Sequence, residues 1–152
     1  MTIMFKAVEK PGPQILTRIL YIEKQDFGEG ALSDYVIIPL MRHGRIYTAV
    51  DEEDVAIASA YFLRDMYDAE LAYLLSVAVL PEFKGYDVGI ALLDYAFSDI
   101  KELGIKKVQL TVDPGNFNAL SIYREKLGFL VVENAPDEYG TGDERLVMAR
   151  EL

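Results

Sequence analysis

The sequence predicts one α+β domain over residues 1–152, with a mixed, mostly antiparallel central sheet of about six to seven strands and about four flanking helices. Alternating apolar runs, typical of strands, are interleaved along the chain with runs of helical period. Hydrophobic residues make up 51% of the 152 residues, which is enough to bury a sizeable core. No internal repeat, linker or low-complexity tract divides the sequence.

The elements follow in the order β-α-α-β-β-β-α-β-α-β-β. Strands are expected at residues 1–9, 46–50, 55–63, 74–80, 107–112, 129–133 and 145–149. Helices are expected at residues 14–25, 31–41, 88–103 and 117–126. Ile15, Ile19 and Ile22 give the first helix an apolar stripe. The second helix contains Pro39 and a strand-prone run just before it, so its type stays open at this level.

One stretch, residues 74–93, organises the rest of the chain. Its first half is an almost continuous apolar run, which predicts a strand buried on both faces, and Pro81 ends that strand. A loop with Lys84, Gly85 and Gly89 leads into a pattern of helical period. A basic loop with glycines between a strand and a helix points backbone N–H groups and the helix dipole at an anion, most often a phosphate.

Charge and composition exclude several classes of protein. The net charge of −10 argues against nucleic-acid binding and suits a cationic partner such as an amine, although an acidic surface also serves solubility alone. The absence of cysteine excludes disulfides, a thiolate nucleophile and a Cys-based metal site. The single histidine, His43, excludes a His-rich zinc centre and is expected to be a turn residue. A site for magnesium or calcium made of carboxylates alone stays open.

No targeting segment is visible in the sequence. The first residues lack the basic and apolar regions of a signal peptide, and no apolar run reaches the length of a membrane span. We therefore expect a cytoplasmic protein without a membrane partner.

Two motifs follow each other on the predicted elements. The first is VAVLP at residues 77–81 followed by KGYDVGIA at residues 84–91. The second is NFNALSIY at residues 116–123, which leads to Gly128 and Phe129. Together they resemble the acetyl-CoA loop and the Asn-x-x-Ala-x-x-x-Tyr motif of the GCN5-related N-acetyltransferases (GNAT). In element order the resemblance covers nearly the whole chain, and it implies a splayed pair of strands at the acyl-CoA site.

This resemblance implies an enzyme that moves an acetyl group from acetyl-CoA to a primary amine of a small molecule or peptide, by direct attack and without a metal. The backbone of Val77, Ala78 and Val79 would hold the pantetheine arm, and an N–H near Val79 would polarise the thioester carbonyl. The diphosphate would lie on the loop formed by Lys84, Gly85, Tyr86, Asp87, Val88, Gly89 and Ile90. Asn116 and Ala119 would also contact the cosubstrate, and Tyr123 would protonate the departing thiolate.

The sequence departs from the family pattern in two places. Asp87 stands where the family has the middle glycine, and its carboxylate adds negative charge and removes freedom for a positive φ. We therefore expect weaker acetyl-CoA binding than in relatives with that glycine. Gly128 also follows Tyr123 by five residues instead of four, so either the helix end carries an extra residue or Tyr123 is rotated.

Each candidate residue also has a structural interpretation. Asp87 is a good N-cap, worth about 1 kcal/mol. Tyr123 has the spacing of a core residue, Asn116 suits a turn, and Lys84 suits a solvated loop. The sequence alone leaves these alternatives open.

No general base is evident in the sequence. Near its C-terminal end the chain resembles the ribosomal-protein alanine acetyltransferases, which carry a glutamate on the strand before the Asn motif. Thr111 occupies that position here and cannot act as the base. Glu70 is a candidate that would act through water, although a carboxylate at a strand edge is often only solvated. Tyr139, in the last hairpin loop, could form a wall of the acceptor site.

Two other functional classes stay open. One is an acyl-CoA-binding regulatory module with weak or no catalysis, suggested by Asp87 and by the absent base. The other is an interaction domain without a CoA site. A homodimer is a further expectation by analogy.

Overall fold

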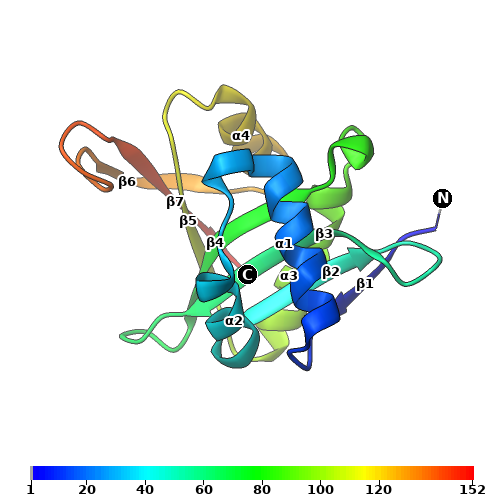
Figure 1. Cartoon of the computed structure of the whole chain (residues 1–152). Helices are drawn as coiled ribbons and strands as arrows, with labels where there is room; N and C mark the ends of the chain where they lie inside the picture. The colour runs from blue at the N-terminus through cyan, green and yellow to red at the C-terminus, as the bar shows by residue number, and fades with distance from the viewer. Residues whose placement is uncertain (1) are drawn as a thin grey trace. The chain divides into compact units, whose positions relative to one another are not determined.

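The computed structural model describes residues 2–152 and contains a seven-stranded sheet in the order β1-β2-β3-β4-β5-β7-β6 (Figure 1). The strands are β1 (Met4–Ala7), β2 (Arg45–Val50), β3 (Ala56–Arg64), β4 (Leu71–Val79), β5 (Lys107–Val112), β6 (Leu130–Ala135) and β7 (Arg145–Glu151). The helices are α1 (Pro13–Phe27), α2 (Asp34–His43), α3 (Val88–Glu102) and α4 (Phe117–Ser121). The predicted fold class and element order are confirmed.

The chain divides into two compact units. The first unit comprises Met1–Leu63 and Leu74–Asp99, and the second comprises Arg64–Tyr73 and Ile100–Leu152. Strand β4 contributes its first three residues to the second unit and its remainder to the first. The expectations of a single domain and of a splayed strand pair remain predictions, because both concern the relation between these units.

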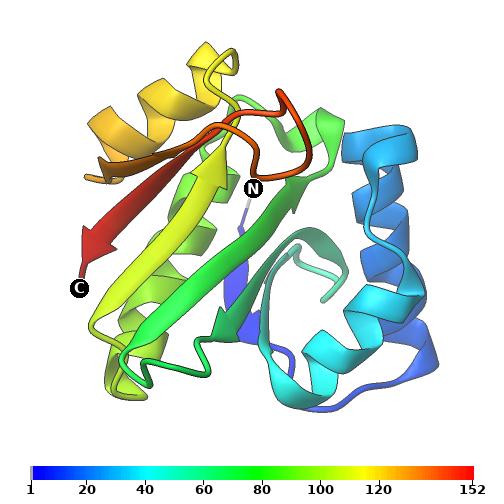
Figure 2. The ribbon, with the colours of Figure 1, turned by 90° about the vertical axis from the view of Figure 1, so that its left-hand side faces the viewer.

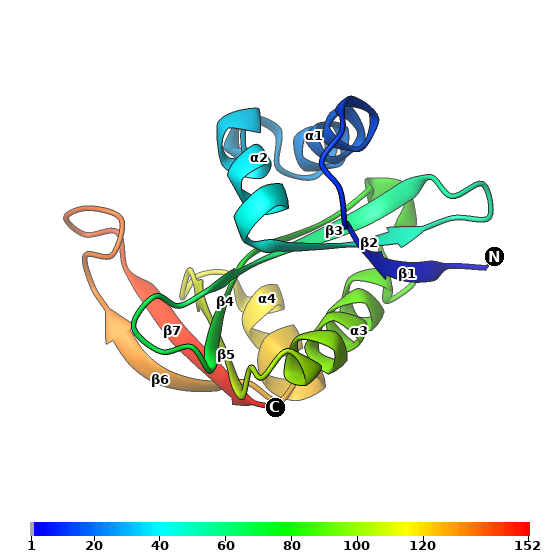
Figure 3. The same ribbon diagram turned by 90° about the horizontal axis from the view of Figure 1, so that it is seen from below.

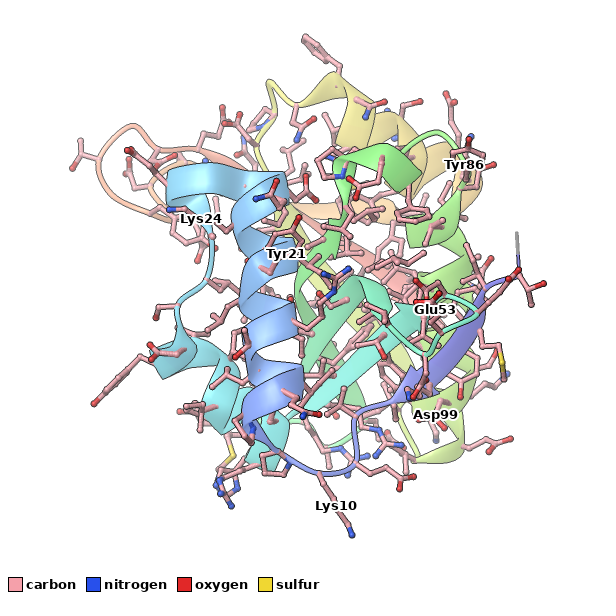
Figure 4. The ribbon with its side chains drawn as sticks, turned by 45° about the vertical axis from the view of Figure 1, so that its right-hand side comes forward. Lys10, Tyr21, Lys24, Glu53, Tyr86 and Asp99 are labelled. Carbon is pink, nitrogen blue, oxygen red and sulfur yellow. The ribbon has the colours of Figure 1, made fainter. Side chains whose placement is uncertain are left out.

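In the first unit, β1, β2 and β3 form an antiparallel ladder that is covered by helices on both faces. Figure 3 shows α1 and α2 on one face of these strands and α3 on the other. One core cluster consists of Ile19, Ile37, Leu40, Met41, Ile46 and Tyr61, all at most 7% exposed. On the other face Asp99 of α3, which is labelled in Figure 4, accepts hydrogen bonds from Tyr47 Oη at 2.5 Å and from Arg45 at 2.9 Å. These bonds tie α3 to β2.

Helix α2 forms in spite of its proline. Pro39 lies inside it, where it removes one backbone hydrogen bond and costs about 3 kcal/mol or more. The buried side chains of Ile37, Leu40 and Met41 lie on one face of α2 and offset that cost by packing into the core cluster. The strand-prone run before Pro39 is therefore helical because tertiary packing outweighs local propensity.

The second unit is built on β5, which pairs with two strands. The start of β4 runs parallel to it, with Leu71 opposite Lys107 and Tyr73 opposite Gln109. Strand β7 runs antiparallel along its other edge and carries β6 as the outer strand, with a register shift between Val131 and Glu133 (Figure 2).

The prediction that residues 74–80 form a strand buried on both faces is wrong for one face. Ala78 and Leu80 are buried, whereas Val77 and Val79 on the opposite face are only half-buried. These two valines lie against the start of α3 at Gly89. A continuous apolar run therefore does not guarantee two covered faces.

Within residues 2–152 no helix has both the length and the apolar character needed to cross a membrane.

Candidate functional site

The connection from β4 to α3 is a short turn-rich loop in which two residues adopt left-handed conformations. It is called the β4–α3 turn below. Leu80 N–H donates to the Ile57 carbonyl at 3.0 Å, and a short 3-10 turn over Pro81–Phe83 follows. Gly85 then has φ +92° and Asp87 φ +56°. Ala91 N–H donates to the Asp87 carbonyl at 3.0 Å and closes the first helical turn. The N–H groups that precede Ala91 in the helix are those that a helix start presents outward.

Asp87 therefore adopts the backbone conformation for which a glycine would be expected. A left-handed conformation costs a residue with a side chain ~1 kcal/mol, and Asp tolerates it better than most. The turn is thus retained in this chain at a conformational cost. Tyr86 extends from the same turn and is 66% exposed (Figure 4).

Gly89 allows α3 to begin directly against β4. A Cβ atom built at Gly89 would lie 3.3 Å from Val79 Cγ2 and 4.0 Å from Val77 Cγ2. The first of these distances is tighter than ordinary van der Waals contact, so a larger residue would push the helix start away from the strand. The loop is thereby held against the end of β4.

A carboxylate from α1 occupies the outer end of this strand. Asp26 Oδ2 accepts a hydrogen bond from the Val79 N–H at 2.9 Å, and its Oδ1 forms an ion pair with Lys84 Nζ. The Asp26 side chain is only 8% exposed, whereas that of Lys84 is 54% exposed. The N–H expected to polarise a thioester carbonyl therefore already has an acceptor.

A second carboxylate on α1 is fully buried. Glu23 is 0% exposed and accepts from the Leu32 N–H at 2.9 Å and from Ser76 Oγ at 3.5 Å. Tyr61, whose hydroxyl lies 2.5 Å from Ser59 Oγ, is a further hydrogen-bonding partner. Burial raises the pKa of Glu23 above its usual value, although these hydrogen bonds act in the opposite direction.

Neither of these acids was among the residues predicted from the sequence. A signal was nevertheless present, because Glu23 follows Ile19 by four residues and Asp26 follows Ile22 by four. Residues four apart share a face of a helix, so the same period that predicted the buried stripe placed two acids on it.

In the second unit, Tyr123 lies in a π turn. The segment Ile122–Lys126 continues α4 with wider backbone hydrogen bonds: Leu127 N–H donates to the Ile122 carbonyl at 3.1 Å and Phe129 N–H to the Tyr123 carbonyl at 2.8 Å. A π turn contains one residue more than an α turn, so the extra residue before Gly128 is absorbed at the helix end. Of the two sequence alternatives, the structure shows the first.

Tyr123 is held in an apolar setting. Its ring packs edge-on against Phe129, with ring centroids 5.6 Å apart. Burial raises the pKa of Tyr123 to about 12, so its phenol is neutral over the physiological range. The packing fits a core tyrosine as well as a functional one.

The start of α4 is capped by Asn116, whose Oδ1 accepts the Ala119 N–H at 3.2 Å.

A group of polar side chains gathers on β4 and β5. Tyr73 Oη lies 3.0 Å from Thr111 Oγ1, and burial, with Tyr139 and Glu138 nearby, raises the pKa of Tyr73. Thr111 is therefore a hydrogen-bonding partner of the Tyr73 phenol. It occupies the position at which the ribosomal-protein alanine acetyltransferases, which the chain resembles near its C-terminal end, carry a glutamate.

Glu70 lies at the surface. Its side chain is 57% exposed and pairs with Lys106 Nζ at 2.9 Å, which favours a structural role.

Tyr139 stacks with the Arg145 guanidinium, 4.8 Å from the ring centroid. Among residues 2–152, no three His, Cys, Asp or Glu side chains gather in a way that could hold a metal ion.

A family model described as the acetyltransferase (GNAT) family matches residues 15–129, which include both motifs. The match covers well over half of the sequence, so the chain belongs to the acetyltransferase (GNAT) family.

The chain is 32% identical over 81 residues to an N-alpha-acetyltransferase from Sulfurisphaera tokodaii. That match covers 53% of this chain and 48% of the relative, so the chain spans about half the length of the curated relative it matches. The solved structures that share the fold include the following two. A ribosomal-protein alanine N-acetyltransferase from Escherichia coli has a TM-score of 0.80 at 20% identity, over 97% of this chain and 94% of that one. A GNAT acetyltransferase from Elizabethkingia anophelis with acetyl-CoA bound has a TM-score of 0.74 at 18% identity, over 99% and 98%.

Glu23→Gln is expected to remove a pH-dependent loss of stability. The raised pKa means that folded Glu23 keeps a proton that the unfolded chain has released, so the free energy of unfolding falls as pH rises through the folded-state pKa. The difference between Glu23→Gln and wild type should therefore grow as pH rises above 4.5.

Urea unfolding at a series of pH values measures this difference. Glu29→Gln, which removes one negative charge from an exposed position on the next segment, is the control. A Glu23→Gln difference that stays constant with pH would contradict the assignment.

Proposed function

We propose that the chain is an acetyl-CoA-dependent N-acetyltransferase that transfers an acetyl group to a primary amine. The observation that carries the proposal is the β4–α3 turn, in which a left-handed residue at position 87 and the close contact of Gly89 with Val79 hold a helix start at the end of a strand. The turn lies inside the range matched by the family model. Such a turn suits an anionic diphosphate.

In this proposal the backbone of Val77, Ala78 and Val79 pairs with the pantetheine arm as an added strand would. The N–H groups at the start of α3 and the loop from Lys84 hold the diphosphate. The acetyl-CoA bound in the Elizabethkingia anophelis structure of the same fold supports this choice of cosubstrate. Asn116 and Ala119 remain proposed contacts of the cosubstrate.

The reaction is the attack of a neutral amine on the thioester carbonyl. Negative charge develops on the carbonyl oxygen, and a backbone N–H directed at that oxygen stabilises it. The Val79 N–H is the proposed donor, once its present acceptor has left. Collapse of the tetrahedral intermediate breaks the C–S bond and releases CoA as a thiolate, and the amine nitrogen loses its proton to solvent water.

The raised pKa of Tyr123 changes its proposed role. A phenol of pKa about 12 is a weaker acid than an alkyl thiol (the pKa of the cysteine thiol is about 8.5), so full proton transfer to the thiolate would be uphill. A neutral phenol can still donate a hydrogen bond to the sulfur as charge builds there. We propose that role for Tyr123 in place of complete protonation.

The acceptor we favour is a cationic amine, including the α-amino group of a peptide. The net charge of −10 draws such molecules toward the protein, and the N-alpha-acetyltransferase relative supports a peptide amine. A second candidate is an acyl-CoA-binding module with weak catalysis. It is favoured by the Asp26 carboxylate on the Val79 N–H.

A panel of amines incubated with acetyl-CoA and followed by CoA release tests both candidates. The panel would contain polyamines, aminoglycosides, lysine and short peptides with free N-termini. Amine-dependent CoA release supports the transferase. Thermal stabilisation by acetyl-CoA without release on any amine would favour the binding module, and the absence of both effects would contradict the two together.

Tyr123→Phe should lower kcat by about 10²-fold while the KM for acetyl-CoA changes by less than about twofold. Phenylalanine keeps the ring contact with Phe129 but removes the hydroxyl, so a loss confined to kcat reports the hydrogen bond to the sulfur. Tyr21→Phe on the exposed side of α1 removes the hydroxyl of a tyrosine outside the proposed site and serves as the control. An unchanged kcat in Tyr123→Phe would exclude this role.

Asp87→Gly should bind acetyl-CoA about three- to tenfold more tightly, as measured by calorimetry. Glycine adopts a positive φ without steric cost, and the substitution removes a negative charge beside the diphosphate. Asp87→Asn separates the two causes, because it removes the charge and keeps a side chain. Unchanged or weaker binding in Asp87→Gly would show that Asp87 does not limit affinity.

A further inference from the structure

Asp26 contacts two parts of the proposed acyl-CoA site, the Val79 N–H and Lys84, and a bound ligand would need both. Its Oδ2 accepts the Val79 N–H at 2.9 Å, and its Oδ1 pairs with Lys84 Nζ at the start of the loop. The carboxylate comes from α1, 53 residues before Val79 in the sequence. The Asp26 side chain is 8% exposed, so water does little to weaken its hydrogen bond with the Val79 N–H, whereas Lys84 is 54% exposed and water partly screens the ion pair.

The two contacts compete directly with acetyl-CoA. A hydrogen bond from an N–H to a carboxylate is roughly twice as strong as one to a neutral carbonyl. A thioester oxygen or a pantetheine amide that takes the Val79 N–H therefore gains less than Asp26 gives up. Lys84, paired with Asp26, is likewise held away from the role of neutralising a diphosphate.

The negative charge of Asp26 adds to this competition. Glu23 lies one helical turn away on α1 and is fully buried, so two acids face the same strand with Lys84 as the cation paired to one of them. An incoming diphosphate meets the field of the Asp26 carboxylate unless Lys84 screens it. A neutral acceptor could also link α1 to β4 by a hydrogen bond with the Val79 N–H. The charged Asp26 in this position additionally repels an anionic ligand.

We propose that Asp26 is a latch on the acyl-CoA site: it holds the Val79 N–H and Lys84 in the free protein, and acyl-CoA binds by displacing it from both. This rests on the proposed function, because it concerns the same site. In the exchange the diphosphate replaces the carboxylate as the partner of Lys84, and an acceptor on the thioester arm replaces it on Val79. The latch lowers the affinity for acyl-CoA without removing the site.

Calorimetry with acetyl-CoA on purified variants of the chain tests the latch. Asp26→Ala removes both contacts and should bind acetyl-CoA about tenfold more tightly than wild type. Asp26→Asn keeps an oxygen that can accept from Val79 but loses the ion pair, so its gain should be smaller. Asp34→Asn makes the same chemical change at an exposed position on α2, and its affinity should stay within about twofold of wild type.

A second ligand separates the two halves of the latch. The nucleotide half of coenzyme A carries the diphosphate but no pantetheine arm, so it can use Lys84 and cannot use the Val79 N–H. Its gain in Asp26→Ala should be smaller than the gain for acetyl-CoA. An equal gain for both ligands would overturn the part of the proposal that concerns Val79.

The failure of the latch and the failure of the proposed function give different results. If wild type binds acetyl-CoA and folded Asp26→Ala binds it equally or less tightly, the latch is wrong and the function stands. If neither wild type nor any variant binds acetyl-CoA, the proposed function fails and the latch fails with it. If Asp26→Ala does not fold, Asp26→Asn and the Val79 amide resonance of wild type replace it: an amide that saturating acetyl-CoA leaves unmoved would overturn the latch.

Discussion

The hydrogen-bonded turn from β4 into α3 is the constraint on which the candidate site depends. The turn places a strand end and a helix start against each other, which requires a position without a side chain at Gly89 and left-handed backbone at Gly85 and Asp87. The first requirement is met by glycine. The last is met by aspartate at a cost of ~1 kcal/mol, so the chain retains the loop conformation while adding a negative charge to it.

The acids of α1 set the electrostatic state of the same strand. Asp26 takes the Val79 N–H and Lys84, while Glu23 is buried among Leu32, Ser76 and Tyr61. Each of the two acids is satisfied by hydrogen-bond donors, as buried polar groups must be. The first unit therefore carries a proposed binding loop in which Lys84 and the Val79 N–H already have a partner within the protein. Under the proposed function, this arrangement predicts a site of modest affinity that a variant can strengthen.

The order of the elements could be predicted because it depends on local periodicity. Ile15, Ile19 and Ile22 were enough to identify α1, and the loop from Lys84 to Gly89 was recognised from its residue types. The extra residue before Gly128 was visible as a spacing, but only the structure shows that a π turn absorbs it. Periodicity was misleading at Val77 and Val79, which are apolar and yet face a glycine.

The contacts of Asp26 and Glu23 could not be predicted from the sequence, because they depend on which strand α1 covers. Hydrophobic period shows that a helix has a buried face and does not show which polar groups lie beneath it. Two acids on an apolar stripe are a recognisable signal of a partner, and the partners themselves are contacts between segments far apart in the sequence. The identity of the general base depends in the same way on contacts between segments far apart in the sequence.

The most direct test of the account is an amide NMR titration of the protein with acetyl-CoA. The proposal predicts that the largest changes in chemical shift fall on the backbone amides of residues 77–79 and 84–90, since these N–H groups would meet the pantetheine arm and the diphosphate. Saturation with acetyl-CoA that shifts amides elsewhere and leaves these two segments unchanged would contradict it.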